Sequence, residues 1–190
     1  MVTPYISEGA RVRAARATRA DGEYLRYRLD VAAASAVDVV QSAGGLLYDR
    51  VMAGWEVTVL LPHGCDSRSL RILGAATLEL ESRFDSPGTA STSQSLAVSA
   101  EAFAADARVR DKVLESLGSG LTEVALWGDG WPLGVNRATA RAQHVLSAAA
   151  RTFKAHALAA AGMPCEAVDP TEALLCDTTS LADSQLVRLD

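Results

Sequence analysis

The stretch from residue 34 to residue 61 limits most strongly what this chain can fold into. Apolar residues and one glycine recur in it at steps of three, four and seven, which places them on one stripe of a helix. They are Val37, Val40, Gly44, Leu47 and Val51. Four polar residues fall off this stripe and are expected to face water: Asp38, Gln41, Asp49 and Arg50. Gly54 follows where a helix would end in a left-handed residue.

Residues 56–61, Glu-Val-Thr-Val-Leu-Leu, come directly after this helix and read as a strand that is apolar on both faces. Such strands lie inside sheets that helices cover on each side. Residues 121–127 have the same character and predict a second buried strand, parallel to the first. Residues 24–31 alternate between apolar and polar side chains, which predicts a half-exposed strand near the edge of the sheet. The strands at 24–31 and 56–61, with the helix between them, make a right-handed parallel unit.

Two further helices complete the expected elements. One covers residues 100–117 and is capped by Ser99, and the other runs from Asn136 to residue 161. Residues 68–83 read as two short strands, or as one strand bent at Gly74. The sequence therefore predicts an α/β fold with a mixed, largely parallel sheet flanked by helices.

The predicted organisation is a single α/β domain over residues 1–164, followed by an acidic C-terminal tail over residues 165–190. Within the domain, residues 85–95 are rich in Ser, Thr, Gly and Pro and are expected to form a mobile loop. In the tail, residues 184–189 could form an edge strand, and the alternative is that the tail is disordered.

The composition bears on location and partners. The net charge of -5 argues against an obligate nucleic-acid binder. Four arginines between residues 11 and 19 leave a phosphate-contacting arm open as an alternative. The three cysteines are odd in number and fit a reducing cytoplasm better than a disulfide framework. The sequence has no run of about 18 apolar residues, so no export signal or membrane segment is expected.

The loop at 62–71 is the first candidate site, because ligands of open α/β sheets bind beyond the carboxyl ends of parallel strands. It contains His63, Cys65 and Asp66. Cys65 and Arg71 have the C-x5-R spacing with which cysteine phosphatases attack phosphorus and hold its oxygens. The loop departs from that pattern, since it has no glycine between the two residues. A polar turn after a buried strand is the structural alternative.

The segment Gly128-Asp129-Gly130-Trp131-Pro132-Leu133-Gly134 is the second candidate site. Its G-x-G-x-x-x-G spacing between a strand and a helix is that of a loop whose amides could approach a dinucleotide. Pro132 removes one amide donor, and no ribose-binding acid is evident downstream. Arg137, Arg141, His144 and Arg151 would share a face of the last predicted helix, either solvated, paired with acids of the tail, or facing an anionic ligand.

No catalytic constellation is complete, and the sequence contains neither a G-x-S-x-G elbow nor a P-loop lysine motif. We therefore predict a cytoplasmic binding or assembly module that acts through protein–protein contacts as a homo-oligomer, without cofactor or metal. The alternative is a small enzyme or a nucleotide- or phosphate-binding protein. Its site would gather His63, Cys65, Asp66 and Asp129 at one rim of the sheet. The expected ligand-binding residues are Gly128, Gly130, Arg137 and Arg141.

Overall fold

A computed structural model describes residues 27–81, 94–163, 166–178 and 187–188. Within these residues, one eight-stranded sheet has the order β3-β2-β1-β4-β5-β7-β6-β8. Its strands are β1 (Arg28–Ala32), β2 (Glu56–Leu61), β3 (Ala76–Glu79), β4 (Ser95–Ser99), β5 (Glu123–Trp127), β6 (Thr139–Val145), β7 (Thr171–Asp177) and β8 (Val187–Arg188). The helices are α2 (Ala36–Met52), α3 (Arg68–Ile72), α5 (Ala100–Ala105), α6 (Ala107–Ser119), α7 (Leu133–Ala138) and α8 (Ala148–Ala160). The predicted α/β class with a mixed, largely parallel sheet is confirmed.

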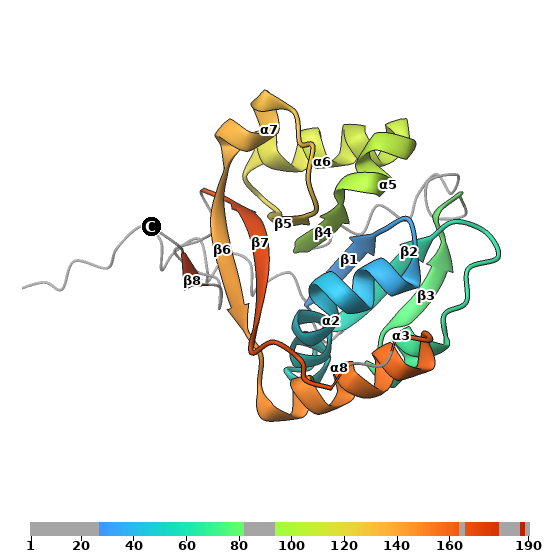
Figure 1. Cartoon of the computed structure of the whole chain (residues 1–190). Coiled ribbons are helices and arrows are strands. Elements are labelled where there is room, and N and C mark those ends of the chain that lie inside the picture. Colours follow the sequence, from blue (N-terminus) through green and yellow to red (C-terminus); the bar gives the residue numbers. More distant parts are fainter. Residues whose placement is uncertain (1–26, 82–93, 164–165, 179–186, 189–190) are drawn as a thin grey trace, which may run out of the picture.

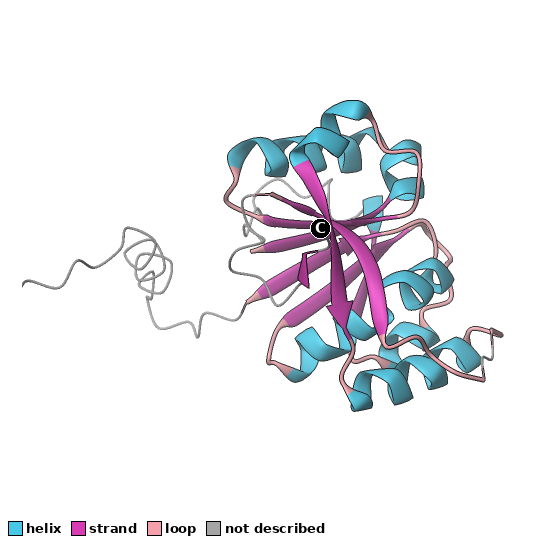
Figure 2. Cartoon of the chain, turned by 60° about the vertical axis from the view of Figure 1, so that its left-hand side comes forward, coloured by secondary structure: helices cyan, strands magenta, loops and turns pink. Residues whose placement is uncertain are grey.

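The helices lie in two layers, one on each face of the sheet (Figures 1 and 2). Strands β1 to β3 follow one another outward, and β4 then pairs with the other side of β1. Right-handed crossovers put the helices before and after such a reversal on opposite faces. Helices α2, α3 and α8 accordingly cover one face, while α5, α6 and α7 cover the other (Figure 1). The strand order thus reverses between β1 and β4, where open sheets of this kind have their crevice.

Each face of the sheet has its own apolar core. Leu29, Val31 and Val59 point toward α2, and the cluster there also contains Trp127. Val98, Val124 and Leu126 belong to the cluster under α5 and α6, together with Trp131. The expected burial of Trp127 is confirmed, since its side chain is inside the core.

Helix α2 and strand β2 form as the sequence predicts. Ser35 begins the helix by accepting a hydrogen bond from the Asp38 amide at 3.2 Å, and Gly54 has the left-handed φ of 86° that the turn requires. The expectation for the off-stripe polar residues is wrong for Arg50, which is buried. Because α8 packs on the outer side of α2, this helix is covered from both sides, and of the four residues only Gln41 is exposed (Figure 1).

Three smaller predictions also need correction. Strand β1 lies in the middle of the sheet between β2 and β4, although its alternating pattern indicated an edge. Residues 68–72 form the short helix α3 instead of a strand. The helix expected at 100–117 is broken at Asp106, whose carboxylate accepts from the Arg108 amide at 2.8 Å and so caps a second helix.

The predicted helix over residues 136–161 is wrong in its first part, where Thr139–Val145 forms strand β6, while Ala148–Ala160 is helical, as α8. Strand β7 pairs with β6 over seven residue pairs, from Thr139 opposite Asp177 to Val145 opposite Thr171. This pairing outweighs the helix preference of alanine, which is about 0.7 kcal/mol or less per residue over ordinary residues. Exposure alternates from Arg141 to Val145, as expected for a strand with one buried face.

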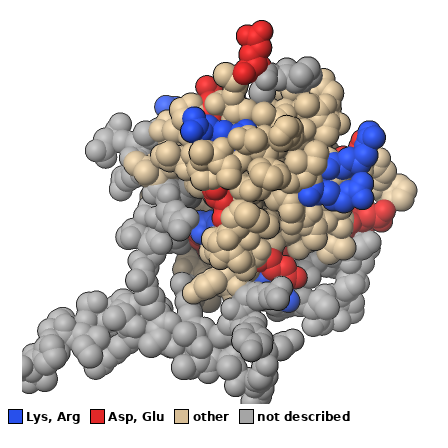
Figure 3. Space-filling model, turned by 90° about the horizontal axis from the view of Figure 1, so that it is seen from below, with Lys and Arg blue, Asp and Glu red and all other residues tan. Residues whose placement is uncertain are grey.

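The residues outside the described part include most of the predicted mobile loop and the arginine-rich N-terminal segment. Ser95, the last residue of the predicted loop, already belongs to β4. No helix in the described ranges is both long and apolar enough to cross a membrane. Figure 3 shows the side on which α8 lies, where the charged side chains form separate groups on a largely uncharged surface.

Candidate functional site

The loop after β2 holds its polar side chains in local pairs. His63 is exposed, and its Nδ1 atom lies 2.6 Å from Oε1 of Glu79 at the end of β3. Asp66 accepts hydrogen bonds from the guanidinium and the amide of Arg68, which lowers the pKa of its carboxyl to about 2. Cys65 is half-buried and packs against the core under α2. Arg71, six residues after Cys65, is exposed in the last turn of α3.

The loop after β5 is shaped by two glycines. Gly128 and Gly130 have left-handed φ values of 86° and 87°. A Cβ atom on Gly128 would lie 3.1 Å from the Cβ of Ala100, so this turn runs close against the beginning of α5. The indole of Trp131 turns back and donates to the Gly128 carbonyl at 3.1 Å. Asp129 is exposed at the tip of the turn.

Both loops lie at the carboxyl edge of the sheet, because β2 and β5 are parallel to β1 and β4. Strands β1 and β4 separate them, which corresponds to about 14 Å at the usual strand spacing. In the described part of the chain no hydrogen bond or ion pair joins His63, Cys65 or Asp66 to Asp129. The structure thus brings the four candidates to one edge, but not to one point.

The arginine stripe predicted for the last helix does not exist. Arg137 lies in α7, whereas Arg141 and His144 lie in β6, so these residues do not share a helix face. Arg137 and Arg141 are both exposed. His144 is buried and takes part in a different group of contacts, described below.

The same carboxyl edge carries a pocket next to the second loop. Its volume is about 630 Å³, and it opens between α2, α8, the end of β5 and the beginning of β7. Polar lining comes from Gln41 and Ser42 of α2, from Lys154 of α8 and from Glu172 of β7. Trp127 and Gly128 form the wall at the end of β5. Gly128 is thus the one predicted ligand-binding residue that lines this pocket.

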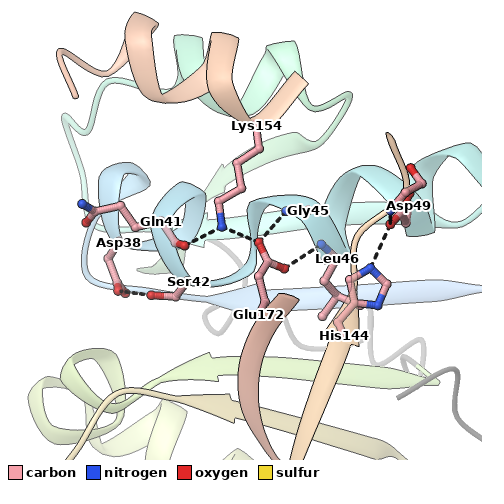
Figure 4. A network of polar contacts seen from close by, with 10 residues as sticks. Asp38, Gln41, Ser42, Gly45, Leu46, Asp49, His144, Lys154 and Glu172 are labelled. Carbon is pink, nitrogen blue, oxygen red and sulfur yellow. Dashed lines mark hydrogen bonds and ion pairs between the residues drawn. The ribbon is translucent and has the colours of Figure 1, made fainter. Parts of the chain in front are cut away.

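A buried ion pair forms one side of the pocket (Figure 4). The Nζ atom of Lys154 lies 2.6 Å from Oε1 of Glu172 and also donates to the Gln41 carbonyl at 2.6 Å. Only 8% of the Lys154 side chain and 2% of the Glu172 side chain are exposed. Glu172 further accepts from the backbone amides of Gly45 at 2.7 Å and Leu46 at 2.9 Å. In a regular helix the Gly45 amide pairs with the Gln41 carbonyl, so the ion pair contacts both partners of one helical hydrogen bond.

Two carboxylates of α2, Asp38 and Asp49, continue this polar row, one near each end of the helix (Figure 4). Near its beginning, Asp38 accepts from the Trp127 indole at 3.0 Å and from the Ser42 hydroxyl at 3.3 Å. Near its end, Asp49 lies 2.9 Å from Nε2 of His144. The other ring nitrogen of His144, Nδ1, is buried without a hydrogen-bond partner in the structure as described. His144 is the register partner of Glu172 across β6 and β7.

Two groups in this pocket are available to a ligand. An ammonium group has three N–H donors, and the two contacts of Lys154 leave one donor free among the described residues. Asp169 is exposed, lines the pocket and makes no hydrogen bond or ion pair within the described ranges. Neither group was predicted from the sequence as part of a site, and the same is true of Glu172. The sequence does carry one sign of Lys154: its charged side chain stands among alanines and apolar residues on the buried side of a helix.

Metal ligands do not gather in the described residues, since no three His, Cys, Asp or Glu side chains there are placed to hold a metal ion.

Comparison with known proteins gives a fold likeness only. No family model matches the sequence, and no curated protein matches it. The A40926 pseudoaglycone deacetylase Dbv21 is similar in structure, with a TM-score of 0.51 and 15% identity over 70% of this chain and 81% of that one. A triple mutant of a deacetylase of teicoplanin biosynthesis gives a TM-score of 0.52 and 14% identity over 86% of this chain and 99% of that one. A deacetylase in complex with teicoplanin gives a TM-score of 0.52 and 13% identity, again over 86% of this chain and 99% of that one.

This comparison contradicts the predicted function, a binding or assembly module acting through protein contacts. The solved structures that share the fold are named as deacetylases, which are enzymes. No local motif in the sequence marks the pocket, because its polar groups come from α2, α8 and β7.

Proposed function

We propose that this chain is a hydrolase that removes an acyl group from an amine, and that it acts in the pocket between α2, α8, β5 and β7. The pocket itself supports this most directly, because it places the free N–H of Lys154 and the unpaired carboxylate of Asp169 around one cavity. The fold likeness to deacetylases supports the same reaction class. The position supports it as well, since the pocket lies at the carboxyl edge of a sheet whose strand order reverses.

Lys154 is suited to stabilise the negative charge that develops on the carbonyl oxygen. Hydrolysis of an amide passes through a tetrahedral state with an oxyanion, and a fixed donor in a water-poor site stabilises that state strongly. Contacts to Gln41 and Glu172 fix the ammonium group, so little reorganisation is needed during the reaction.

Asp169 is suited to act as the general base. Its carboxylate accepts a proton from a water molecule, the water oxygen bonds to the carbonyl carbon, and the carbonyl electron pair moves to the oxygen beside Lys154. The C–N bond then breaks, and the amine nitrogen takes the proton from Asp169. The products are a carboxylic acid and a free amine, so atoms and charges balance.

The two described cysteines, Cys65 and Cys176, are free thiols. Free thiols persist in reducing compartments, which supports action in the cytoplasm.

The test is release of free amine from a panel of N-acyl sugars and N-acyl amino acids by the purified chain. We expect D169N to lower turnover by about 10²–10⁴-fold, which is the usual contribution of a general base. D129N is the matched control, because Asp129 is an exposed aspartate outside the pocket lining, and it should retain turnover. The proposal fails if no amine is released from the panel, or if D169N keeps full turnover.

A further inference from the structure

The pocket is lined by polar side chains (its polar half) and by apolar side chains (its apolar half), and this lining points to one class of ligand. We propose that it holds an uncharged acyl group, with the carbonyl oxygen at Lys154 and an apolar chain extending along Leu158, Met163 and Val168. The inference rests on the proposed function only in taking the substrate to be an N-acyl amine.

The charge balance of the polar half disfavours an anionic ligand. Glu172 already neutralises Lys154 at 2.6 Å, and both side chains are at least nine-tenths buried. A bound carboxylate or phosphate would add an uncompensated negative charge next to Glu172, which is costly away from water. Asp169 lines the same pocket and adds to this repulsion. A neutral carbonyl accepts the third N–H of Lys154 without changing the charge of the site. The oxyanion of the proposed reaction adds no charge either, because its charge comes from Asp169, which is protonated in the same step.

The apolar half provides room for a chain longer than an acetyl group. Leu158 is buried in the core under α2, and Val168 packs partly against the same core. Met163 is exposed at 43%, so a ligand chain lying on it would remove apolar surface from water. Ligand pockets of about 300–1,000 Å³ hold whole small molecules, and the 630 Å³ found here lies within that range. Each methylene buried in this half should raise affinity by up to roughly four-fold.

In this arrangement Glu172 is a positioning residue that sets selectivity. It holds the ammonium group in place and cancels its charge, while Lys154 makes the contact to the ligand. Removal of the Glu172 charge should therefore change which ligand binds, in addition to its effect on stability. An exclusively structural role would leave the preference between a neutral and an anionic ligand unchanged.

The test compares N-methylhexanamide with hexanoate at pH 7.5 by NMR titration of the whole chain. We expect the amide to bind at least ten-fold more tightly than the carboxylate, and its affinity to rise along the series from N-methylacetamide to N-methylhexanamide. Ala167 is exposed and lines the pocket outside any strand, so A167F should fill the pocket and abolish amide binding. A76F is its matched control, since Ala76 is also an exposed alanine but lies in β3, outside the pocket lining. Where E172Q folds, it should shift the preference toward hexanoate.

Several results would overturn the inference: no binding of N-methylhexanamide, equal or tighter binding of hexanoate, or binding that survives A167F. Its failure is distinguishable from that of the proposed function. Selective amide binding without any amine release refutes hydrolysis and supports the ligand class. Amine release that is equally fast for acetyl and hexanoyl substrates, with hexanoate bound as tightly as the amide, refutes the ligand class alone.

Discussion

Leu146 packs so closely on the backbone of Gly45 that a Cβ atom at Gly45 would overlap Cγ and Cδ2 of that leucine. The close approach brings the beginning of α8 against the middle of α2, next to the Gly45 amide that donates to Glu172. We expect G45A to lower the free energy of unfolding by about 1–3 kcal/mol, the usual cost of overpacking.

Gly44 provides the matched control for this change. A Cβ atom there would make ordinary contacts, the nearest at 3.4 Å from Leu73 Cδ1. Alanine is the better helix former, so G44A should be neutral or stabilising by up to about 1 kcal/mol. Urea unfolding measures both variants. Equal effects of G45A and G44A would contradict the close packing at Gly45.

Because Lys154 and Glu172 form a buried ion pair, the effects of K154M and E172Q on the free energy of unfolding should not add. K154M leaves the Glu172 carboxylate buried without its cation and should destabilise the chain by about 3–5 kcal/mol. In the double variant K154M/E172Q no uncompensated charge remains, and much of this loss should be recovered. K112M removes the exposed partner of Glu115 and should change stability by less than about 1 kcal/mol. Additive effects of K154M and E172Q would show that the two charges do not interact.

The buried carboxyl of Glu123 predicts a pH dependence of stability. Burial raises the pKa of this group above 4.5, Arg50 opposes the shift, and the nearby Asp177 adds to it. A raised pKa in the folded state gives a contribution that is complete below pH 4.5 and is lost as the pH rises through the folded value. The free energy of unfolding of the wild type, relative to E123Q, should therefore fall between pH 4.5 and neutrality.

For Asp66 the pH dependence should have the opposite sign and lie in a lower pH range. The free energy of unfolding of the wild type, relative to D66N, should fall as the pH falls. The hydrogen bond from Arg68 holds the pKa of Asp66 at about 2, so its contribution is present above 3.8 and lost as the pH falls toward 2. Urea unfolding at a series of pH values checks both variants. A wild-type-to-E123Q difference that stays constant from pH 4.5 to 7 would refute the assignment for Glu123.

Cys176 should resist thiol reagents in the folded protein. Burial, with Glu123 and Asp177 nearby, raises the pKa of its thiol to about 12, and the thiolate is the reactive form. In a variant with Cys65 and Cys165 replaced by serine, labelling by a disulfide reagent should occur only through unfolding and accelerate with urea. A variant that retains only the half-buried Cys65 should react faster. Fast labelling of Cys176 in native buffer would contradict its burial in β7.

The sequence predicts the elements whose signal is local. Strands β2 and β5 are apolar runs that are buried on both faces, and glycines mark where their preceding helices end. Strands β6 and β7 lack such a signal. Thr139–Val145 contains alanines and an arginine that fit a helix equally well, and the acids of β7 resemble those of a solvated tail. Both strands depend on pairing between segments that are distant in the chain.

The sequence predicts where in the fold the candidate site lies, but not which residues form it. The carboxyl edge follows from the parallel strands, and Gly128 does line the pocket there. Glu172, in contrast, binds the Gly45 amide across 127 residues, a contact that no sequence spacing reveals. Asp66 pairs instead with Arg68, two residues away, and His63 contacts Glu79 at the end of the next strand, so neither side chain belongs to the pocket.

The insertion of β7 between β5 and β6 has a consequence for synthesis of the chain. Strand β6 pairs only with β7 and β8 in the described sheet, and both come after it. At about 5–20 residues per second, a ribosome needs a few seconds to pass from the end of β6 to the end of β7. During that interval the nascent chain has an unpaired strand and an open side of β5, two edges at which another chain could pair until β7 fills the gap.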